Sequence, residues 1–325
     1  MNADWTNTTP ADLLRSHLNR KPPTARAYRY DLIALANALG IVDIDPANDE
    51  ALATIVEAVV DSSRGAAQRR LDDYVAMMKA DGVPLNTMRR RVASTMSLLA
   101  MAHRYDVVAW SIKRPGRLPA AGPVRDTSGP GREAVEAMMA ICRSRDDAKG
   151  DRDLAIMSLL YYQALRRGEI VSIRVSDYNA EAATVAVQAK GRIGRVVIPL
   201  TDSTDEAIDA WLRVRGRSRG AMFTTCCRAA VAAGKQTPLT GDGLYHVVRD
   251  LGERVGVTAR PHGIRHTAAS EVIRLTNGNL RLAMALTRHT NPATLMYYDD
   301  AVQNLHRRAA LILDRGRPVF SSASR

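Results

Sequence analysis

Residues 184–200 read TVAVQAKGRIGRVVIPL, and this stretch is informative about the fold class. β-Branched residues alternate on both sides of Gly191 and Gly194, which predicts two strands joined in a β-hairpin. Most of the remaining chain has helical spacing instead. In TARAYRYDLIALANALG (residues 24–40), for example, the apolar residues fall on one face and stop at a glycine. The sequence therefore predicts a mainly α fold with a small β-hairpin or sheet.

Proline and glycine divide the chain into two parts. They interrupt the helical pattern in the stretch that begins at Lys113, KRPGRLPAAGPVRDTSGPGREAV. We place a helical N-terminal domain at residues 1–114, an exposed linker at 115–132, and an α+β domain with a C-terminal tail at 133–325. A chain of 325 residues is long enough for two domains that each bury a core.

The charge of the chain points to a polyanionic partner. The formal net charge is +12, an excess that a solvated surface does not need. Charge alone does not distinguish DNA from RNA or an anionic membrane. The three cysteines have no metal-ligand spacing and predict neither disulfides nor a zinc site. The N-terminus lacks signal-peptide features and the longest apolar run is short, so we expect a soluble, cytoplasmic protein without a membrane partner.

Two short motifs suggest chemistry that their surroundings do not support. GPGREA (residues 129–134) matches G-x-G-x-x-A but follows the linker, whereas a dinucleotide-binding loop must follow a strand. His262 and His266 are spaced as in zinc metalloproteases, yet Gly263 occupies the position of the required glutamate. We therefore expect neither a nucleotide cofactor nor a metal site.

Four separated segments place cationic or phosphate-seeking side chains beside apolar helix. They are YYQALRRGEIVSIRVSDY, QAKGRIGR at the hairpin tip, RPHGIRHTAAS and TRHTNPATLMYY. Each segment alone is a weak signal, because single arginines are usually solvated and single histidines usually pack. The side chains of interest are Arg166, Lys190, His262, Arg265, His289 and the pair Tyr297 and Tyr298.

Together and in this order, these residues resemble the tyrosine recombinases, the integrase and Xer-like family. The family's pattern is an Arg in G-L-R-x-x-E, a Lys on a β-hairpin, H-x-x-R, a His or Trp, and a Tyr nine residues later. In this chain it falls on Arg166, Lys190, His262, Arg265, His289 and Tyr298. The resemblance covers roughly residues 133–310, and the N-terminal domain is similar to the family's core DNA-binding domain by a looser pattern.

The chain departs from the family's pattern at two backbone-packing positions. Ala164 stands where the family usually has glycine, and TRH (residues 287–289) replaces the common LGH. We expect these changes to leave the chemistry intact. They argue against a close match to any one housekeeping Xer protein.

The resemblance implies a site-specific recombinase that needs no cofactor. Such an enzyme cleaves and rejoins duplex DNA through a 3′-phosphotyrosyl intermediate, which retains the bond's free energy, and exchanges strands via a Holliday junction in a tetrameric synapse. The implied roles are nucleophilic attack by Tyr298, phosphate binding by Arg166 and Arg265, protonation of the leaving 5′ oxygen by Lys190, proton removal by His262, and a phosphate hydrogen bond from His289. Glu169 would orient or neutralise a nearby arginine.

The resemblance also implies duplex DNA and neighbouring subunits as partners. Candidate DNA contacts are Arg89, Arg90, Arg91, Arg192 and Arg195. The first three lie early in a predicted helix, where cations oppose the macrodipole; an external anion would compensate them, or they are merely solvated. We expect a homotetramer on DNA, or an assembly with related recombinase subunits. Its C-terminal helix, NLHRRAALILDR, would dock on a neighbour or else close its own domain.

Two other functions remain open from the sequence. One is a catalytically silent DNA-binding regulator or accessory protein on the same fold. The other is a type IB topoisomerase-like relaxase, which shares the chemistry without the tetramer. The resemblance further places the protein in a bacterium, associated with the nucleoid.

Overall fold

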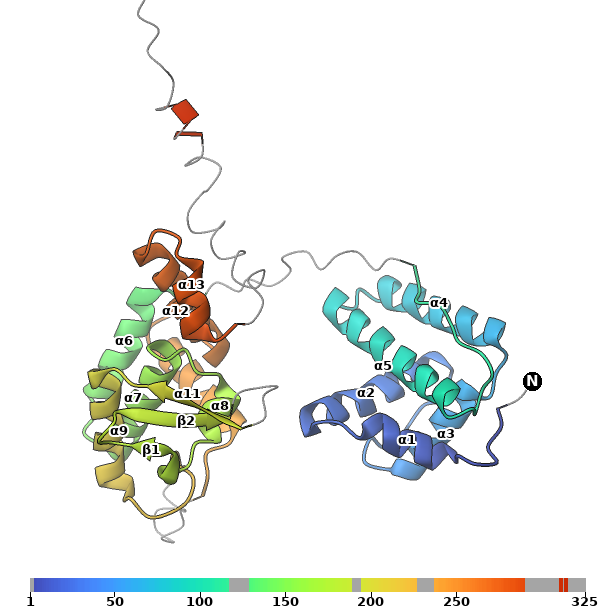
Figure 1. The fold of residues 1–325 in the computed structure, drawn as a ribbon, viewed down its shortest axis with the longest axis horizontal. Helices are drawn as coiled ribbons and strands as arrows, with labels where there is room; N and C mark the ends of the chain where they lie inside the picture. Colours follow the sequence, from blue (N-terminus) through green and yellow to red (C-terminus); the bar gives the residue numbers. More distant parts are fainter. Residues whose placement is uncertain are drawn as a thin grey trace, which may run out of the picture. The chain divides into compact units, whose positions relative to one another are not determined.

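The computed structural model describes residues 3–116, 129–188, 194–226 and 237–289, together with residues 310, 311, 313 and 314. The chain forms two compact units, Met1–Arg125 and Asp126–Arg325 (Figure 1). The division falls inside the predicted linker. The predicted limits of the two domains and of the linker remain predictions, since residues 117–128 lie outside the described ranges.

The N-terminal unit is a bundle of helices in its described residues. They are α1 (Pro10–Leu18), α2 (Pro22–Ala38), α3 (Asp49–Val60), α4 (Arg64–Ala80) and α5 (Leu85–Arg104). Helix α1 begins at a capping box, in which Thr9 and Asp12 each accept a hydrogen bond from the other's backbone N–H. Helix α1 packs against α3 and α5, and α2 packs against α5 and α3, so one apolar core joins these elements.

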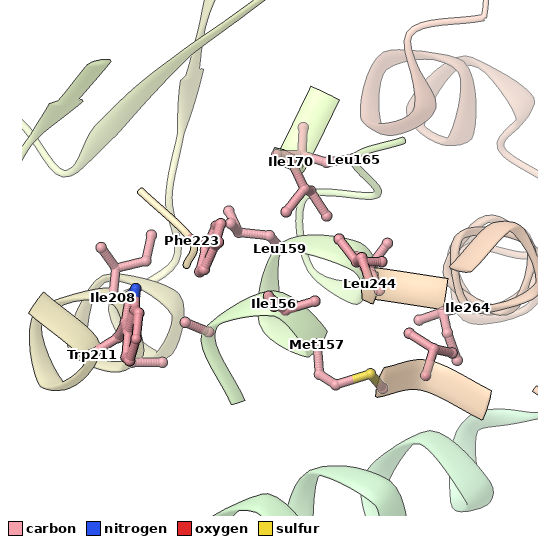
Figure 2. Packing of buried hydrophobic residues seen from close by; sticks show 14 of the residues in the cluster. Ile156, Met157, Leu159, Leu165, Ile170, Ile208, Trp211, Phe223, Leu244 and Ile264 are labelled. Atoms are coloured by element: carbon pink, nitrogen blue, oxygen red, sulfur yellow. The ribbon is translucent and has the colours of Figure 1, made fainter. Parts of the chain in front are cut away.

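The C-terminal unit combines helices with a small sheet. Its described helices are α6 (Arg132–Arg143), α7 (Ala148–Tyr161), α8 (Arg167–Val171), the short 3₁₀ helix η1 (Val175–Asp177), α9 (Asp202–Arg215), α11 (Gly241–Arg254), α12 (Pro261–Leu275) and α13 (Leu280–Thr287). Helix α7 is buried on nearly all sides, because α6, α9 and α12 pack around it. In Figure 2, Ile156 and Met157 of α7 lie between Trp211 of α9 and Ile264 of α12.

The sheet has three antiparallel strands in the order β1-β2-β3. They are β1 (Tyr178–Asn179), β2 (Thr184–Gln188) and β3 (Arg195–Pro199). Val187 pairs with Val196 across β2 and β3, and Val185 pairs with Ile198. This pairing confirms the predicted hairpin strands, and the mainly α fold class is confirmed with them. The sequence pattern did not predict β1, because two residues are too few for a period of two to show.

Gly129 holds the start of this unit against α12. A Cβ atom at Gly129 would lie 2.0 Å from Thr267 Oγ1 and 2.1 Å from the Gly263 carbonyl oxygen. The first glycine of the GPGREA stretch is thus needed for close packing against the helix that carries His262 and Arg265. Within the described residues, no helix combines the length and apolar character needed to cross a bilayer.

Candidate active site

Arg166 follows the turn at the end of α7. Ala164 adopts a left-handed conformation with φ 45°, and the Leu165 N–H donates to the Leu159 carbonyl oxygen at 3.0 Å. This closure is typical of a helix C-terminus, where the left-handed position usually carries glycine. Arg166 then becomes extended and serves as the N-cap of α8. The guanidinium of Arg166 therefore starts from a backbone position that hydrogen bonds hold on both sides.

Glu169 anchors Arg166 through both oxygens. The backbone N–H of Arg166 donates to Glu169 Oε2 at 2.9 Å, and Arg166 Nη1 donates to Oε1 at 2.8 Å. The Glu169 side chain is only 3% exposed, whereas that of Arg166 is 29% exposed. Burial acts to raise the pKa of Glu169, but the hydrogen bonds from Arg166 and the charge of Arg288 outweigh it, and the net shift is downward. Glu169 is therefore a charged carboxylate that leaves part of Arg166 open to solvent.

Helix α12 places His262 and Arg265 on one face, one turn apart. Arg265 is 1% exposed, and its guanidinium donates to two backbone carbonyls, from Nη1 to Ala164 and from Nη2 to Thr287. These bonds tie the turn after α7 and the end of α13 to one side chain.

His289 has a defined hydrogen-bond partner. The hydroxyl of Thr287 donates its single hydrogen to the Ala283 carbonyl at 2.6 Å, and Thr287 Oγ1 lies 3.0 Å from His289 Nδ1. The Thr287 oxygen must therefore accept from Nδ1–H, which leaves Nε2 of the neutral ring without a proton. Burial, followed by the charges of Arg265 and Arg166, lowers the pKa of His289 to about 4.

His262 shares this electrostatic environment. Burial lowers the pKa of His262, and the charges of Arg265 and Arg166 lower it further. The ring of His262 packs edge-on against that of His266 at 4.1 Å between centroids, and burial lowers the pKa of His266 to about 3. His262 is consequently neutral at pH 7. A neutral imidazole beside two arginines can accept a proton.

The structure thus brings together five of the seven residues that the sequence assigned to catalysis. They are Arg166, Glu169, His262, Arg265 and His289, which come from the turn after α7, from α8, from α12 and from the end of α13. Lys190 and Tyr298 lie outside the described residues, as do Tyr297 and Arg192. Among the residues that the structure does describe, no group of three His, Cys, Asp or Glu side chains could hold a metal ion.

One further residue of the site did not emerge from the sequence. Arg288 lies in a left-handed conformation at the end of α13, and Arg288 Nη2 donates to Glu169 Oε2 at 2.9 Å. The only signal for it in the sequence was the departure from LGH, which looked like a change of backbone packing. A side chain that returns to a carboxylate 119 positions earlier leaves no local pattern.

The cations at the start of α5 have a partner within the N-terminal unit. Arg90 Nη1 lies 2.6 Å from Asp31 Oδ1 of α2 and donates to the Ala27 carbonyl at 3.1 Å. The Asp31 side chain is 1% exposed; burial raises its pKa, and the charges of Arg90 and Arg91 offset this only in part. Asp31 is therefore an internal anion that pairs with Arg90, and an external anion or solvation remains a prediction for the three arginines as a group.

Arg195, another candidate DNA contact, forms an ion pair with Asp177. The pairing links β3 to the short helix η1, and the Arg195 side chain is partly exposed. Arg89 in α5 is half-buried. Whether any of these arginines contacts DNA remains a prediction from the sequence.

The guanidinium and imidazole groups gathered at this site are suited to binding a phosphate and to moving a proton. The family model described as the phage integrase family matches residues 132–304. The chain belongs to this family, that of the tyrosine recombinases, and is accordingly a DNA strand-exchange enzyme.

Individual relatives extend the likeness over most of the chain. The tyrosine recombinase slr0733 of Synechocystis sp. is 30% identical over 307 residues, which cover 93% of this chain and 92% of the relative. A tyrosine recombinase of Synechococcus elongatus is 33% identical over 300 residues, 90% of this chain and 88% of the relative. The crystal structure of the XerH site-specific recombinase bound to palindromic difH substrate, a post-cleavage complex, has a TM-score of 0.64. It is 14% identical, covers 97% of this chain and 100% of that one, and so shows a shared fold.

Proposed function

We propose that this protein is a site-specific recombinase that cuts and rejoins duplex DNA through a 3′-phosphotyrosyl bond at Tyr298. The observation that carries the proposal is the convergence of Arg166 and Arg265 with two histidines of lowered pKa. Such a set matches the demands of phosphoryl transfer without a metal. Tyr298 and Lys190 enter by their positions in the family's sequence pattern.

The two arginines suit the charge that builds on the phosphate. As the tyrosine attacks, negative charge grows on two non-bridging oxygens, and a preorganised donor is worth roughly 3–4 kcal/mol there. The carbonyls of Ala164 and Thr287 hold the Arg265 guanidinium in place before DNA arrives. Glu169 does the same for Arg166. Neither arginine must then reorganise during the reaction.

His262 suits the removal of the nucleophile's proton. A free phenol has a pKa of about 10, so ionising it at pH 7 costs ~4 kcal/mol. His262 is neutral at that pH because burial and Arg265 lower its pKa, and it can act as the base. Lys190 would donate a proton to the leaving 5′ oxygen, the role that the family's sequence pattern implies for it.

His289 must gain a proton before it can donate a hydrogen bond to the phosphate. Its Nδ1–H is directed to Thr287, so a hydrogen bond from Nε2 to a phosphate oxygen requires the imidazolium form. A bound phosphate raises the pKa of a neighbouring imidazole by its charge. DNA binding is therefore expected to draw in a proton at His289.

Duplex DNA is the partner that the net charge of +12 favours, and the XerH complex shows a protein of the same fold bound to its DNA substrate. We further propose a tetrameric synapse in which strands exchange through a Holliday junction, with the C-terminal helix docked on a neighbouring subunit. A chain truncated after Asp300 should then cleave DNA but fail to form the tetramer. Tetramers from the truncated chain would rule out the docking role.

The test of the proposed function begins with the unknown DNA site. Genomic fragments that remain attached to the protein in detergent identify the cleavage site by sequencing. A duplex carrying that site with a nick beside the scissile phosphate then traps the covalent adduct. We expect an adduct with the wild type and none with Arg166→Ala. If no genomic fragment stays attached in detergent although the protein binds duplex DNA tightly, the protein is the silent regulator instead.

A further inference from the structure

Glu169 receives a second guanidinium besides that of Arg166. Arg288 Nη2 donates to Oε2 at 2.9 Å, while Arg166 Nη1 donates to Oε1 at 2.8 Å. The carboxylate carries one negative charge and is almost fully buried, so the two cations share it. Without Arg288, that charge would act on Arg166 alone.

Arg288 also braces the turn that leads to Arg166. Arg288 Nη1 donates to the Gln163 carbonyl at 3.0 Å, and Nη2 donates to the Ala164 carbonyl at 3.3 Å. The Ala164 carbonyl accepts from Arg265 Nη1 as well. A single side chain thus contacts the carboxylate that anchors one phosphate-binding arginine and the carbonyl that anchors the other.

The backbone is strained at two of the residues that make these contacts. Arg288 has φ 56° and Ala164 has φ 45°, both in the left-handed region that favours glycine. These are the two positions at which the chain departs from the family's glycines, and the side chain of one reaches the backbone of the other. Strain of this kind persists where surrounding contacts over-determine it, and it clusters at active sites.

We propose that Arg288 is a positioning residue for the two phosphate-binding arginines, an inference that rests on the proposed recombinase function. Arg288 pairs with the negative charge of Glu169, so that Glu169 neutralises less of the positive charge with which Arg166 would bind a DNA phosphate. It also holds the Ala164 carbonyl against Arg265. Its own guanidinium is 15% exposed and is directed to protein acceptors, so it acts through its neighbours.

The test compares Arg288→Gly and Arg288→Lys with the wild type in the full chain. Glycine relieves the strained backbone while the ion pair is lost, so stability should stay close to that of the wild type. The rate of adduct formation at saturating DNA should nevertheless fall about 10- to 100-fold, because the phosphate site loses its alignment. DNA affinity should change by no more than about twofold, and lysine should restore part of the rate. Arg281→Gln, at an exposed position of α13, controls for the loss of one charge and should leave the rate unchanged.

A second readout needs no DNA. Phenylglyoxal modifies exposed arginines, and mass spectrometry reports the rate at Arg166. In Arg288→Gly, Glu169 holds Arg166 alone, so Arg166 should react at least about threefold more slowly. An unchanged Arg166 rate together with wild-type cleavage would overturn the inference, as would a loss of cleavage matched by a loss of folded protein. If the wild type forms no adduct on any DNA, the proposed function fails, and the Arg166 rate still decides the positioning role.

Discussion

Replacing Gly129 by alanine should disturb the active site from outside it. The added Cβ would lie 2.0 Å from Thr267 Oγ1 and 2.1 Å from the Gly263 carbonyl oxygen, and a stable contact needs at least about 3 Å. The linker or α12 must therefore move by roughly 1 Å. Overpacking of this kind typically costs about 1–3 kcal/mol of the free energy of unfolding. Because α12 carries His262 and Arg265, a shift of that size should lower the rate of adduct formation up to about 100-fold.

Hydrogen exchange followed by mass spectrometry can measure the protection of backbone amides in the two units separately. In Gly129→Ala, peptides from α12 should exchange faster while peptides from α4 keep their protection. The matched control is Gly65→Ala in α4, where the added Cβ would meet only Arg69 Nη1 at 3.7 Å. This change should stabilise the N-terminal unit by up to about 1 kcal/mol, because alanine favours helix over glycine. Wild-type exchange in α12 and wild-type cleavage by Gly129→Ala would refute the reasoning.

Three other changes test the electrostatics. Asp31→Asn should leave the N-terminal unit at least as stable as the wild type at pH 7, because the pKa of Asp31 is raised in the folded state and its charged form therefore opposes folding. In urea titrations, the difference in the free energy of unfolding between the two proteins should vanish as the pH falls towards about 3.5. Burial lowers the pKa of His17 to about 4, so its contribution to stability is present above pH 6.5 and is lost as the pH falls towards 4. His17→Phe should remove up to about 3 kcal/mol of this acid sensitivity, and an unchanged pH profile of unfolding would contradict the burial argument. Thr287→Val removes the acceptor of His289 Nδ1 and should slow adduct formation about 10-fold, whereas Thr287→Ser should not.

Sequence patterns predicted the elements whose signal is local and periodic. The alternation in residues 184–200 was sufficient for the strands β2 and β3, and helical spacing was sufficient for the bundle of the N-terminal unit. The spacing of His262 and Arg265 also placed both side chains on one face of a helix. The two-residue strand β1 was too short to show any period.

Contacts between distant positions could not be predicted in this way. Asp31 and Arg90 form an ion pair although they are 59 positions apart, and the sequence around neither residue indicates its partner. Arg288 looked like a backbone substitution because its role depends on Glu169, which belongs to another element. Left-handed conformations at residues other than glycine could not be predicted from the sequence either, since they arise only when the surrounding contacts impose them.

The identity of the attacking tyrosine is the most direct test of the proposed chemistry. Tyr297 and Tyr298 are adjacent in the sequence, and the nine-residue spacing from His289 selects Tyr298. On the nicked substrate, Tyr298→Phe should form no covalent adduct, while Tyr297→Phe should form it at close to the wild-type rate. Digestion of the wild-type adduct should yield a DNA-linked peptide with the modification on Tyr298. An adduct that survives in Tyr298→Phe, or one that is lost only in Tyr297→Phe, would contradict the proposed chemistry.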